Sequence, residues 1–154
     1  MLVALLAAAP FVQAQPGMSQ STEKKITVTS DIRYRDGQSQ AWMLDLAEPE
    51  QLPGGGLRPA IVIVHGGGWA FGSKSDQVYR DLLISYALQG YVTISVEYRF
   101  VQEAPLPACI EDVKCAVRWL KAHADKYQVD PERIGVYGHS AGAHLSLMIG
   151  VSSD

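Results

Sequence analysis

The sequence has 154 residues, of which 47% are hydrophobic and 19% charged, a composition typical of one globular domain and not of a disordered chain. The formal net charge is −3 and no block of basic residues occurs, which argues against a surface for nucleic acid or anionic membrane. The four histidines and two cysteines follow no metal-ligand spacing, so we expect no metal ion. No organic cofactor is implied either.

The N-terminus carries an apolar segment of the kind found in secretory signal peptides. Residues 2–12 are rich in Leu and Ala, and Val12-Gln13-Ala14 fits a signal peptidase site. The segment is too short for stable membrane insertion, and no Lys or Arg precedes it. We therefore expect residues 1–14 to be the signal peptide of a secreted or periplasmic protein, followed by a linker over 15–25. The alternative is a frayed hydrophobic N-terminus.

The pattern of apolar residues then predicts a β-hairpin followed by alternating strands and helices. Strands are predicted over residues 26–34, 41–47, 60–64, 91–96 and 134–137, and helices over 78–87, 110–124 and 141–149. Asp36-Gly37 marks the hairpin, and Asp130-Pro131 marks a turn before the last strand. The alternation favours an α/β fold: a mostly parallel sheet with an antiparallel N-terminal hairpin and helices on both faces.

Two of the predicted helices carry further signals. The first has Asp76 as its N-cap and Gly90 as its stop, and its buried face is predicted to consist of Val78, Leu82, Leu83, Tyr86 and Ala87. On the second, Cys109 and Cys115 are six residues apart and point to different faces. We interpret the two cysteines as small buried residues and not as a disulfide.

Gly138-His139-Ser140-Ala141-Gly142 has the form G-x-S-x-G and lies between a predicted strand and a predicted helix. This is the context of a nucleophile elbow, in which side chains at 138 and 142 would clash. We expect Ser140 to be exposed in a strained backbone conformation at the helix N-terminus, and we predict that it is the catalytic nucleophile. The alternative is a glycine-rich turn with a serine that has no role.

A second glycine-rich segment, His65-Gly66-Gly67-Gly68-Trp69, follows the buried strand at 60–64. Acyl transfer needs backbone amides aimed at the oxyanion, and glycines let a loop turn its amides outward. The predicted amide donors are those of Gly67, Gly68 and Ala141, with Gly66 and His65 in support, the histidine holding the loop by hydrogen bonding. A flexible hinge, the alternative, does not account for the bulky Trp69.

Together with Glu97-Tyr98-Arg99, the 109–120 helix and the 130–135 segment, these motifs resemble the hormone-sensitive-lipase-like carboxylesterases of the α/β-hydrolase superfamily. The similarity covers about residues 24–154 and is greatest to secreted acetylxylan/feruloyl-esterase-like (BD-FAE-like) members. Such esterases often carry the sequence Asp-Tyr-Arg-Leu-Ala-Pro where this chain departs from them, with Glu97-Tyr98-Arg99-Phe100-Val101-Gln102. The resemblance implies a serine carboxylesterase that hydrolyses esters of small or carbohydrate-linked acyl groups through an acyl-enzyme on Ser140.

In that fold the catalytic acid and histidine follow the serine along the chain, and fourteen residues follow Ser140. The resemblance therefore implies that residues 26–154 are an α/β-hydrolase domain truncated after the nucleophile helix, with an incomplete triad. The chain's own histidines are interpreted as structural: His65, His123, His139 and His144. Two alternatives stay open, a non-catalytic fragment or remnant of a hydrolase, and an arylformamidase-like amide hydrolase, whose motifs GHSAGAHL also resembles.

Overall fold

A computed structural model describes residues 25–50 and 56–152. The elements are β1 (Ile26–Arg33), β2 (Met43–Pro49), β3 (Arg58–Val64), α1 (Gln77–Leu88), β4 (Val92–Val96), α2 (Ala108–Ala122), α3 (Ala124–Tyr127), β5 (Val129–Gly138) and α4 (Ala141–Val151). The predicted signal peptide and nearly all of the predicted linker lie outside the described residues. Within the described ranges, no helix is long and apolar enough to cross a membrane.

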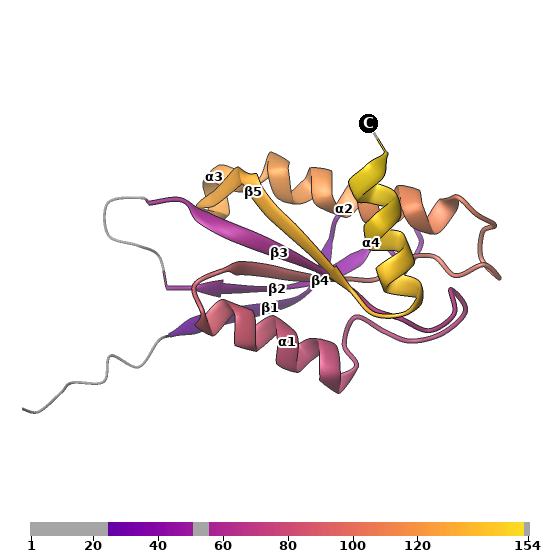
Figure 1. The fold of residues 1–154 in the computed structure, drawn as a ribbon, viewed down its shortest axis with the longest axis horizontal. Helices are drawn as coiled ribbons and strands as arrows, with labels where there is room; N and C mark the ends of the chain where they lie inside the picture. The colour runs from indigo at the N-terminus through magenta and orange to yellow at the C-terminus, as the bar shows by residue number, and fades with distance from the viewer. Residues whose placement is uncertain (1–24, 51–55, 153–154) are drawn as a thin grey trace, which may run out of the picture.

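The strands described form one mixed sheet in the order β1-β2-β4-β3-β5 (Figure 1). β2 pairs antiparallel with both β1 and β4, whereas β3 pairs parallel with β4 and β5. The predicted hairpin and the predicted parallel strands are both confirmed. Because β3, β4 and β5 run in the same direction, their carboxyl ends meet at one edge of the sheet. The glycine-rich segments of the sequence follow two of these ends.

Helices cover both faces of the sheet, with α1 on one face and α2 and α4 on the other (Figure 1). β3 supplies alternate side chains to the two cores. Val62 and Val64 pack in the cluster that contains Leu120 of α2, whereas Ile63 packs in the cluster that contains Leu83 of α1. This two-sided burial explains the continuous β-branched run at 60–64 and confirms the prediction of a strand covered on both faces.

The predicted ends of α1 are confirmed. Asp76 is its N-cap, although its carboxylate accepts a hydrogen bond from the Ser73 amide and caps no amide of the helix. Gly90 has φ +100°, and its amide donates to the Ala87 carbonyl at 2.9 Å. The following amide, that of Tyr91, donates to the Tyr86 carbonyl at 3.2 Å. These two bonds form a Schellman motif, which requires the left-handed backbone that glycine adopts without strain.

The predicted buried face of α1 is wrong in one respect. Val78 is 58% exposed, and Tyr79, Leu83 and Ala87 line the face that packs on the sheet. Val78 was assigned to the buried face because its side chain is apolar, and Tyr79 was left out because its side chain carries a hydroxyl. That hydroxyl is satisfied inside the protein, since it accepts a hydrogen bond from the Gly66 amide at 2.8 Å.

Several element boundaries in the second half differ from the predicted ones, the start of β5 by the most. β5 begins at Val129, five residues earlier than predicted, and its pairing with β3 shifts in register at the predicted Asp130-Pro131 turn. Proline has no amide to donate, so the ladder is interrupted there and resumes at Ile134. α2 ends at Ala122, two residues earlier than predicted, and a short helix, α3, follows it.

α2 is joined to the hairpin side of the sheet by a fully buried carboxylate. Asp112 accepts hydrogen bonds from the Arg99 Nε at 2.8 Å, from an Arg35 guanidinium nitrogen at 3.0 Å and from the Trp42 indole at 3.0 Å. Two guanidinium groups thus compensate one buried charge. This arrangement accounts for the arginine of the Glu97-Tyr98-Arg99 motif, which fixes the chain after β4.

The cysteines are free thiols, as predicted. Cys109 is buried in the core beneath α2, and burial raises the pKa of its thiol. Cys115 is half-buried and its sulfur lies 3.8 Å from the Tyr34 carbonyl oxygen. Neither thiol has the exposed, electropositive surroundings of a reactive cysteine.

Candidate active site

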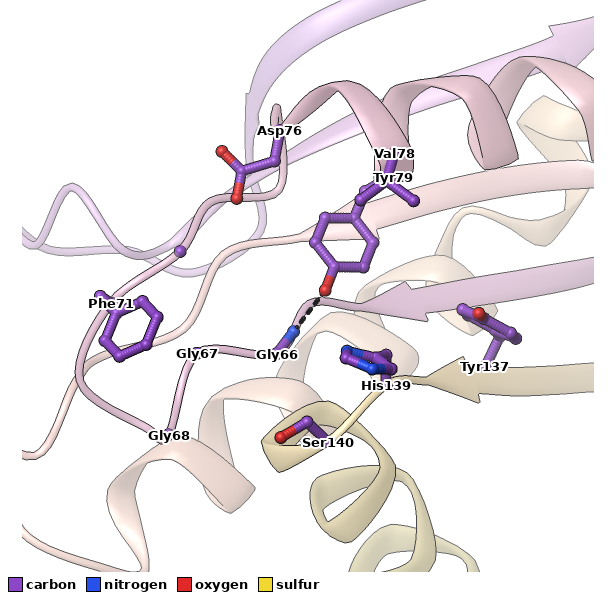
Figure 2. Close-up of a pocket in the computed structure, with 11 residues that line it drawn as sticks. Gly66, Gly67, Gly68, Phe71, Asp76, Val78, Tyr79, Tyr137, His139 and Ser140 are labelled. Atoms are coloured by element: carbon purple, nitrogen blue, oxygen red, sulfur yellow. Dashed lines mark hydrogen bonds between the residues drawn. The ribbon is translucent and has the colours of Figure 1, made fainter.

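Ser140 occupies the sharp turn between β5 and α4, as its place in the sequence predicts. Its backbone has φ 54° and ψ −119°, a region in which an L-residue is strained, and its side chain is exposed. Figure 2 shows the hydroxyl directed toward the loop that carries Gly67 and Gly68. The predicted strained and exposed conformation is therefore present, at the amino end of a helix where the helix dipole is positive.

The two outer glycines of the motif are required by close backbone contacts. A Cβ atom on Gly138 would overlap the backbone of Gly142. A Cβ atom on Gly142 would overlap the carbonyl oxygens of Val64 and His65, where β3 ends. The predicted clash is confirmed for both positions. The second contact adds that the elbow packs directly on the start of the other glycine-rich segment.

The loop after β3 has a run of left-handed residues. Gly67, Gly68 and Trp69 have φ values of +122°, +58° and +60°. The Gly67 carbonyl accepts the amides of Ala70 and Phe71, each at 3.0 Å, which closes a tight turn. Within the described part of the chain, the Gly67 and Gly68 amides donate no hydrogen bond. They are free to bind a ligand in front of the loop.

The third predicted donor is the first amide of α4. Ala141 follows Ser140 directly, and the first amides of a helix have no partner inside the helix. The next amide, that of Gly142, is taken by the His139 carbonyl at 2.9 Å. No described residue accepts the Ala141 amide. All three predicted amides thus lack acceptors, and Gly67 and Gly68 line the same cavity as Ser140.

This cavity has a volume of about 530 Å³. Its lining is mostly aromatic and glycine, and consists of Gly66, Gly67, Gly68, Phe71, Gly72, Asp76, Val78, Tyr79, Tyr137, His139 and Ser140 (Figure 2). Phe71 is 68% exposed at the cavity and Tyr137 is 37% exposed. A bound molecule with an apolar or ring-shaped group would cover this exposed aromatic surface.

None of the four histidines donates to or accepts from the Ser140 hydroxyl among the described residues. His144 is edge-on to Trp69, with 5.4 Å between ring centroids, and His123 stacks on Trp119 at the end of α2. His139 lines the cavity as the chain neighbour of Ser140. The interpretation of the histidines as structural stays a prediction.

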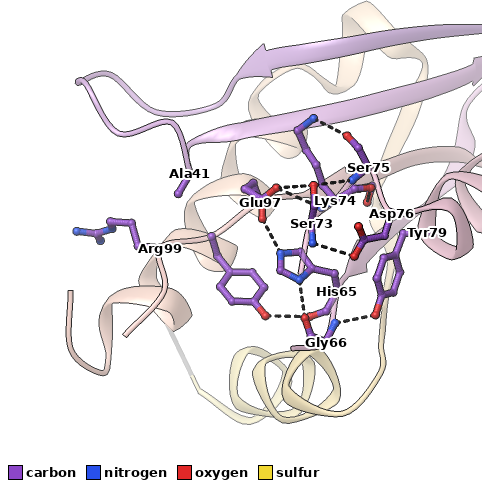
Figure 3. A network of polar contacts seen from close by, with 12 residues as sticks. Ala41, His65, Gly66, Ser73, Lys74, Ser75, Asp76, Tyr79, Glu97 and Arg99 are labelled. Carbon is purple, nitrogen blue, oxygen red and sulfur yellow. Dashed lines mark hydrogen bonds and ion pairs between the residues drawn. The ribbon is translucent and has the colours of Figure 1, made fainter. Parts of the chain in front are cut away.

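His65 is fully buried at the base of the loop. Its Nδ1 lies 2.7 Å from the Gly66 carbonyl oxygen and its Nε2 lies 2.6 Å from Glu97 Oε1 (Figure 3). Its ring stacks on Tyr98, with 4.3 Å between centroids and 14° between planes. Burial raises the pKa of Tyr98, whose neutral hydroxyl donates to the His65 carbonyl at 3.0 Å. The histidine is therefore fixed on all sides.

Glu97 has a part in the site that the sequence did not reveal. Besides contacting His65, its second carboxylate oxygen accepts the Ser73 hydroxyl at 3.1 Å and the Lys74 amide at 3.2 Å (Figure 3). One carboxylate at the end of β4 thus joins both ends of the loop, residues 65 and 73–74. One signal in the sequence could have indicated this part: Glu97 is an ionisable residue directly after a buried strand, as the two glycine-rich segments also directly follow strands.

The far end of the loop is anchored to the hairpin by a buried lysine. The Lys74 ammonium donates to Asp45 of β2 at 2.7 Å and to Asp31 of β1 at 2.8 Å. Burial opposes its charge, but the hydrogen bonds to the two carboxylates outweigh burial and raise the pKa of Lys74. A raised pKa means that this contribution to stability is complete at neutral pH and is lost only as the pH rises through the raised value.

Comparison with known proteins gives a family and a set of relatives. The BD-FAE family model matches residues 44–154. Esterase LipC of Mycobacterium tuberculosis is 37% identical over 120 residues, 77% of this chain and 29% of LipC. Neutral cholesterol ester hydrolase 1 of Rattus norvegicus is 40% identical over 97 residues, 61% of this chain and 24% of that enzyme. The chain therefore spans less than a third of the length of these relatives.

Two solved structures extend the comparison to the fold. A truncated form of a carbohydrate esterase from gut microbiota has a TM-score of 0.68 and 32% identity, over 81% of this chain and 43% of that one. Esterase B from Lactobacillus rhamnosis, solved with a tributyrin phosphonate, has a TM-score of 0.68 and 27% identity, over 78% of this chain and 38% of that one. The mixed sheet with helices on both faces is thus an α/β-hydrolase fold, as the resemblance implied.

Proposed function

The chain belongs to the BD-FAE family, and on that premise we propose that it carries the nucleophile and the oxyanion site of a serine carboxylesterase. The observation that supports this most directly is the position of Ser140, exposed and strained at a helix N-terminus, in one cavity with the free amides of Gly67 and Gly68. A strained serine presented to unpaired amides is the arrangement that acyl transfer requires.

In the proposed reaction the Ser140 oxygen attacks the ester carbonyl and its proton passes to a general base. The amides of Gly67, Gly68 and Ala141 hold the oxyanion of the tetrahedral intermediate. Collapse of the intermediate breaks the ester bond, and the alcohol leaves with the proton from the base. Water then adds to the acyl-enzyme by the same route and releases the acid. The base is proposed to be a histidine other than the four of this chain, since none of those contacts the serine hydroxyl.

The proposed substrate is an ester of a small or carbohydrate-linked acyl group. A cavity of about 530 Å³ has room for a short acyl group together with part of its alcohol. The exposed rings of Phe71 and Tyr137 offer flat apolar surface on which an aromatic acyl group or a sugar ring could stack. Names of relatives point in the same direction, as they include a carbohydrate esterase and an esterase solved with a tributyrin phosphonate.

We expect the 154-residue chain, expressed alone, to hydrolyse a short-chain p-nitrophenyl ester only weakly. A neutral serine hydroxyl is a poor nucleophile without a base in hydrogen-bond reach, and none of the chain's histidines is placed there. Oxyanion binding alone leaves about 10³–10⁴-fold catalysis over water when triad residues are removed. The measurement is the steady-state rate, together with labelling of Ser140 by a fluorophosphonate probe read by mass spectrometry.

The outcome that contradicts this expectation is stoichiometric labelling of Ser140 with brisk turnover. His139 or His144 would then be the base, and His139→Gln and His144→Gln would identify which of them. Labelling at another serine, with Ser140 unmodified, would contradict the proposed nucleophile itself.

We also propose that the protein is secreted or periplasmic and that its mature chain begins near Gln15. The support is the apolar segment that ends in Val12-Gln13-Ala14. Mass spectrometry of protein recovered from the medium or the periplasm is expected to show a new N-terminus at or close to this position. Recovery of the protein in the cytoplasm with Met1 intact would refute the proposal.

A further inference from the structure

Both ring nitrogens of the buried His65 face oxygen atoms that act as hydrogen-bond acceptors. Nδ1 lies 2.7 Å from the Gly66 carbonyl oxygen, which can only accept. Nε2 lies 2.6 Å from Glu97 Oε1, a carboxylate oxygen (Figure 3). A neutral imidazole has one N–H and cannot donate at both positions. The geometry thus requires a second proton, either on the ring or on the carboxyl group.

The surroundings of the pair place that proton on the ring. A carboxyl group is a stronger acid than an imidazolium, and the other oxygen of Glu97 accepts hydrogen bonds from the Ser73 hydroxyl and the Lys74 amide. The face of Tyr98 is stacked on the ring at 4.3 Å, and an aromatic face attracts positive charge. The pair is therefore an imidazolium and a carboxylate, joined by a short charge-assisted bond.

No other charge opposes this assignment among the described groups packed around the ring. The groups facing it are Glu97 at the end of β4, the ring of Tyr98 and, edge-on, that of Phe100, the ring of Tyr79 from α1, and the Gly66 carbonyl. Tyr98 stays a neutral phenol because burial raises its pKa. The ammonium of Lys74, at the far end of the loop, is paired with Asp31 and Asp45.

The charge acts on the peptide group between Gly66 and Gly67. The Gly66 carbonyl receives the His65 Nδ1–H, and the N–H of the same peptide group belongs to Gly67, one of the free amides beside Ser140. A hydrogen bond to a carbonyl polarises the peptide group and strengthens its N–H as a donor, more so when the bond comes from a cation. The Gly68 amide lacks this support, because the Gly67 carbonyl is bound by two neutral amides.

We propose that His65 is a doubly protonated imidazolium, held by Glu97, that acts as a positioning residue and polarises the Gly67 amide for oxyanion binding. This inference rests on the proposed esterase function only in its last clause. The charge of His65 can be tested in the chain without any hydrolysis. Failure of this inference is therefore distinguishable from failure of the proposed esterase function.

The first experiment is ¹⁵N NMR of the full 154-residue chain with labelled histidine, assigned by single replacement of His123, His139 and His144. Both nitrogens of His65 are expected to show the imidazolium signature at pH 7. A neutral tautomer of His65 at pH 7 would overturn the proposal. No variant of the buried pair is needed for this result.

The second experiment uses Glu97→Gln, which can keep every hydrogen bond while removing the charge. The glutamine oxygen can accept from Ser73 and Lys74 while its amide donates to Nε2 of a neutral ring protonated on Nδ1. We expect His65 to become that neutral tautomer, and the Gly67 amide proton to move upfield while that of Gly68 stays unchanged. Glu103→Gln is the matched control, because it makes the same change at an exposed glutamate that accepts a hydrogen bond from the Ser39 hydroxyl. This variant should change neither the His65 nitrogen signals nor the two amide proton signals.

In the active esterase, Glu97→Gln should lower kcat about tenfold with KM nearly unchanged, because the weakened donor acts on the oxyanion and not on the bound ester. A shift of the Gly67 amide equal to that of Gly68, or an unchanged kcat, would overturn the polarising role. If instead Ser140→Ala leaves hydrolysis intact, the esterase proposal fails while the charge of His65 stands on the NMR result.

Discussion

Replacing Ser140 with alanine is expected to lower kcat for ester hydrolysis by the active esterase by at least about 10⁴-fold, because the acyl-enzyme can no longer form. The fold should persist, since the side chain is exposed and its hydroxyl has no partner among the described residues. Its free energy of unfolding should change by no more than about 0.5 kcal/mol. The measurements are initial rates on a p-nitrophenyl ester and urea unfolding of the same samples.

Ser85→Ala is the matched control for this variant. Ser85 is an exposed serine on α1 that does not line the cavity. The Ser85→Ala variant should hydrolyse the ester at the wild-type rate and unfold at the same urea concentration as the wild type. Turnover by Ser140→Ala within tenfold of the wild-type rate would remove Ser140 from the mechanism and with it the proposed function.

Adding one methyl group at Gly142 is expected to destabilise the chain by about 3 kcal/mol or more, a large value for a single added carbon. The new Cβ would overlap the carbonyl oxygens of Val64 and His65, which are held in place by β3 and by the contacts of the His65 ring. Main-chain atoms fixed in this way cannot move aside as a flexible side chain could. Thermal unfolding of Gly142→Ala should show a midpoint lower by roughly 10 °C.

Gly150→Ala makes the same chemical change on the same helix, at a position where the new methyl group meets nothing within 4 Å. Alanine is favoured over glycine in a helix by about 0.5–1 kcal/mol, so this variant should be slightly more stable than the wild type. The two variants together separate helix propensity from the contact with β3. Equal stability of the two would show that α4 does not pack on the end of β3 as described.

The succession of strands and helices along the chain and the direction of the strands could be predicted from the sequence, because they depend on local patterns. The β-branched run at 60–64 and the Asp36-Gly37 hairpin each carry their signal within a few residues. The strained conformation at Ser140 was likewise predictable, because the spacing of two glycines around it has a steric cause. Boundaries were less accurate, as at β5, where pairing with β3 continues across a proline that interrupts the ladder.

His65 was predicted to hold the loop by hydrogen bonding, but most partners of the loop could not be predicted, because they are residues far apart in the chain. His65 meets Glu97, 32 residues away, and Lys74 meets Asp31, 43 residues away. Tyr79 was passed over for a similar reason, since its hydroxyl is compatible with burial only once the Gly66 amide is in place. Periodicity reports which side chains avoid water but not which polar groups find one another inside.

The ion pairs of Lys74 have a consequence for anyone who would modify the protein. An N-terminal hairpin at the margin of a sheet looks like a dispensable segment, suited to trimming or to the insertion of an affinity tag. Here Asp31 and Asp45 of that hairpin accept hydrogen bonds from the Lys74 ammonium. The backbone amide of the same lysine donates to Glu97. Edits to the first two strands would therefore be transmitted to the serine's side of the sheet, and tags or truncations belong before residue 25.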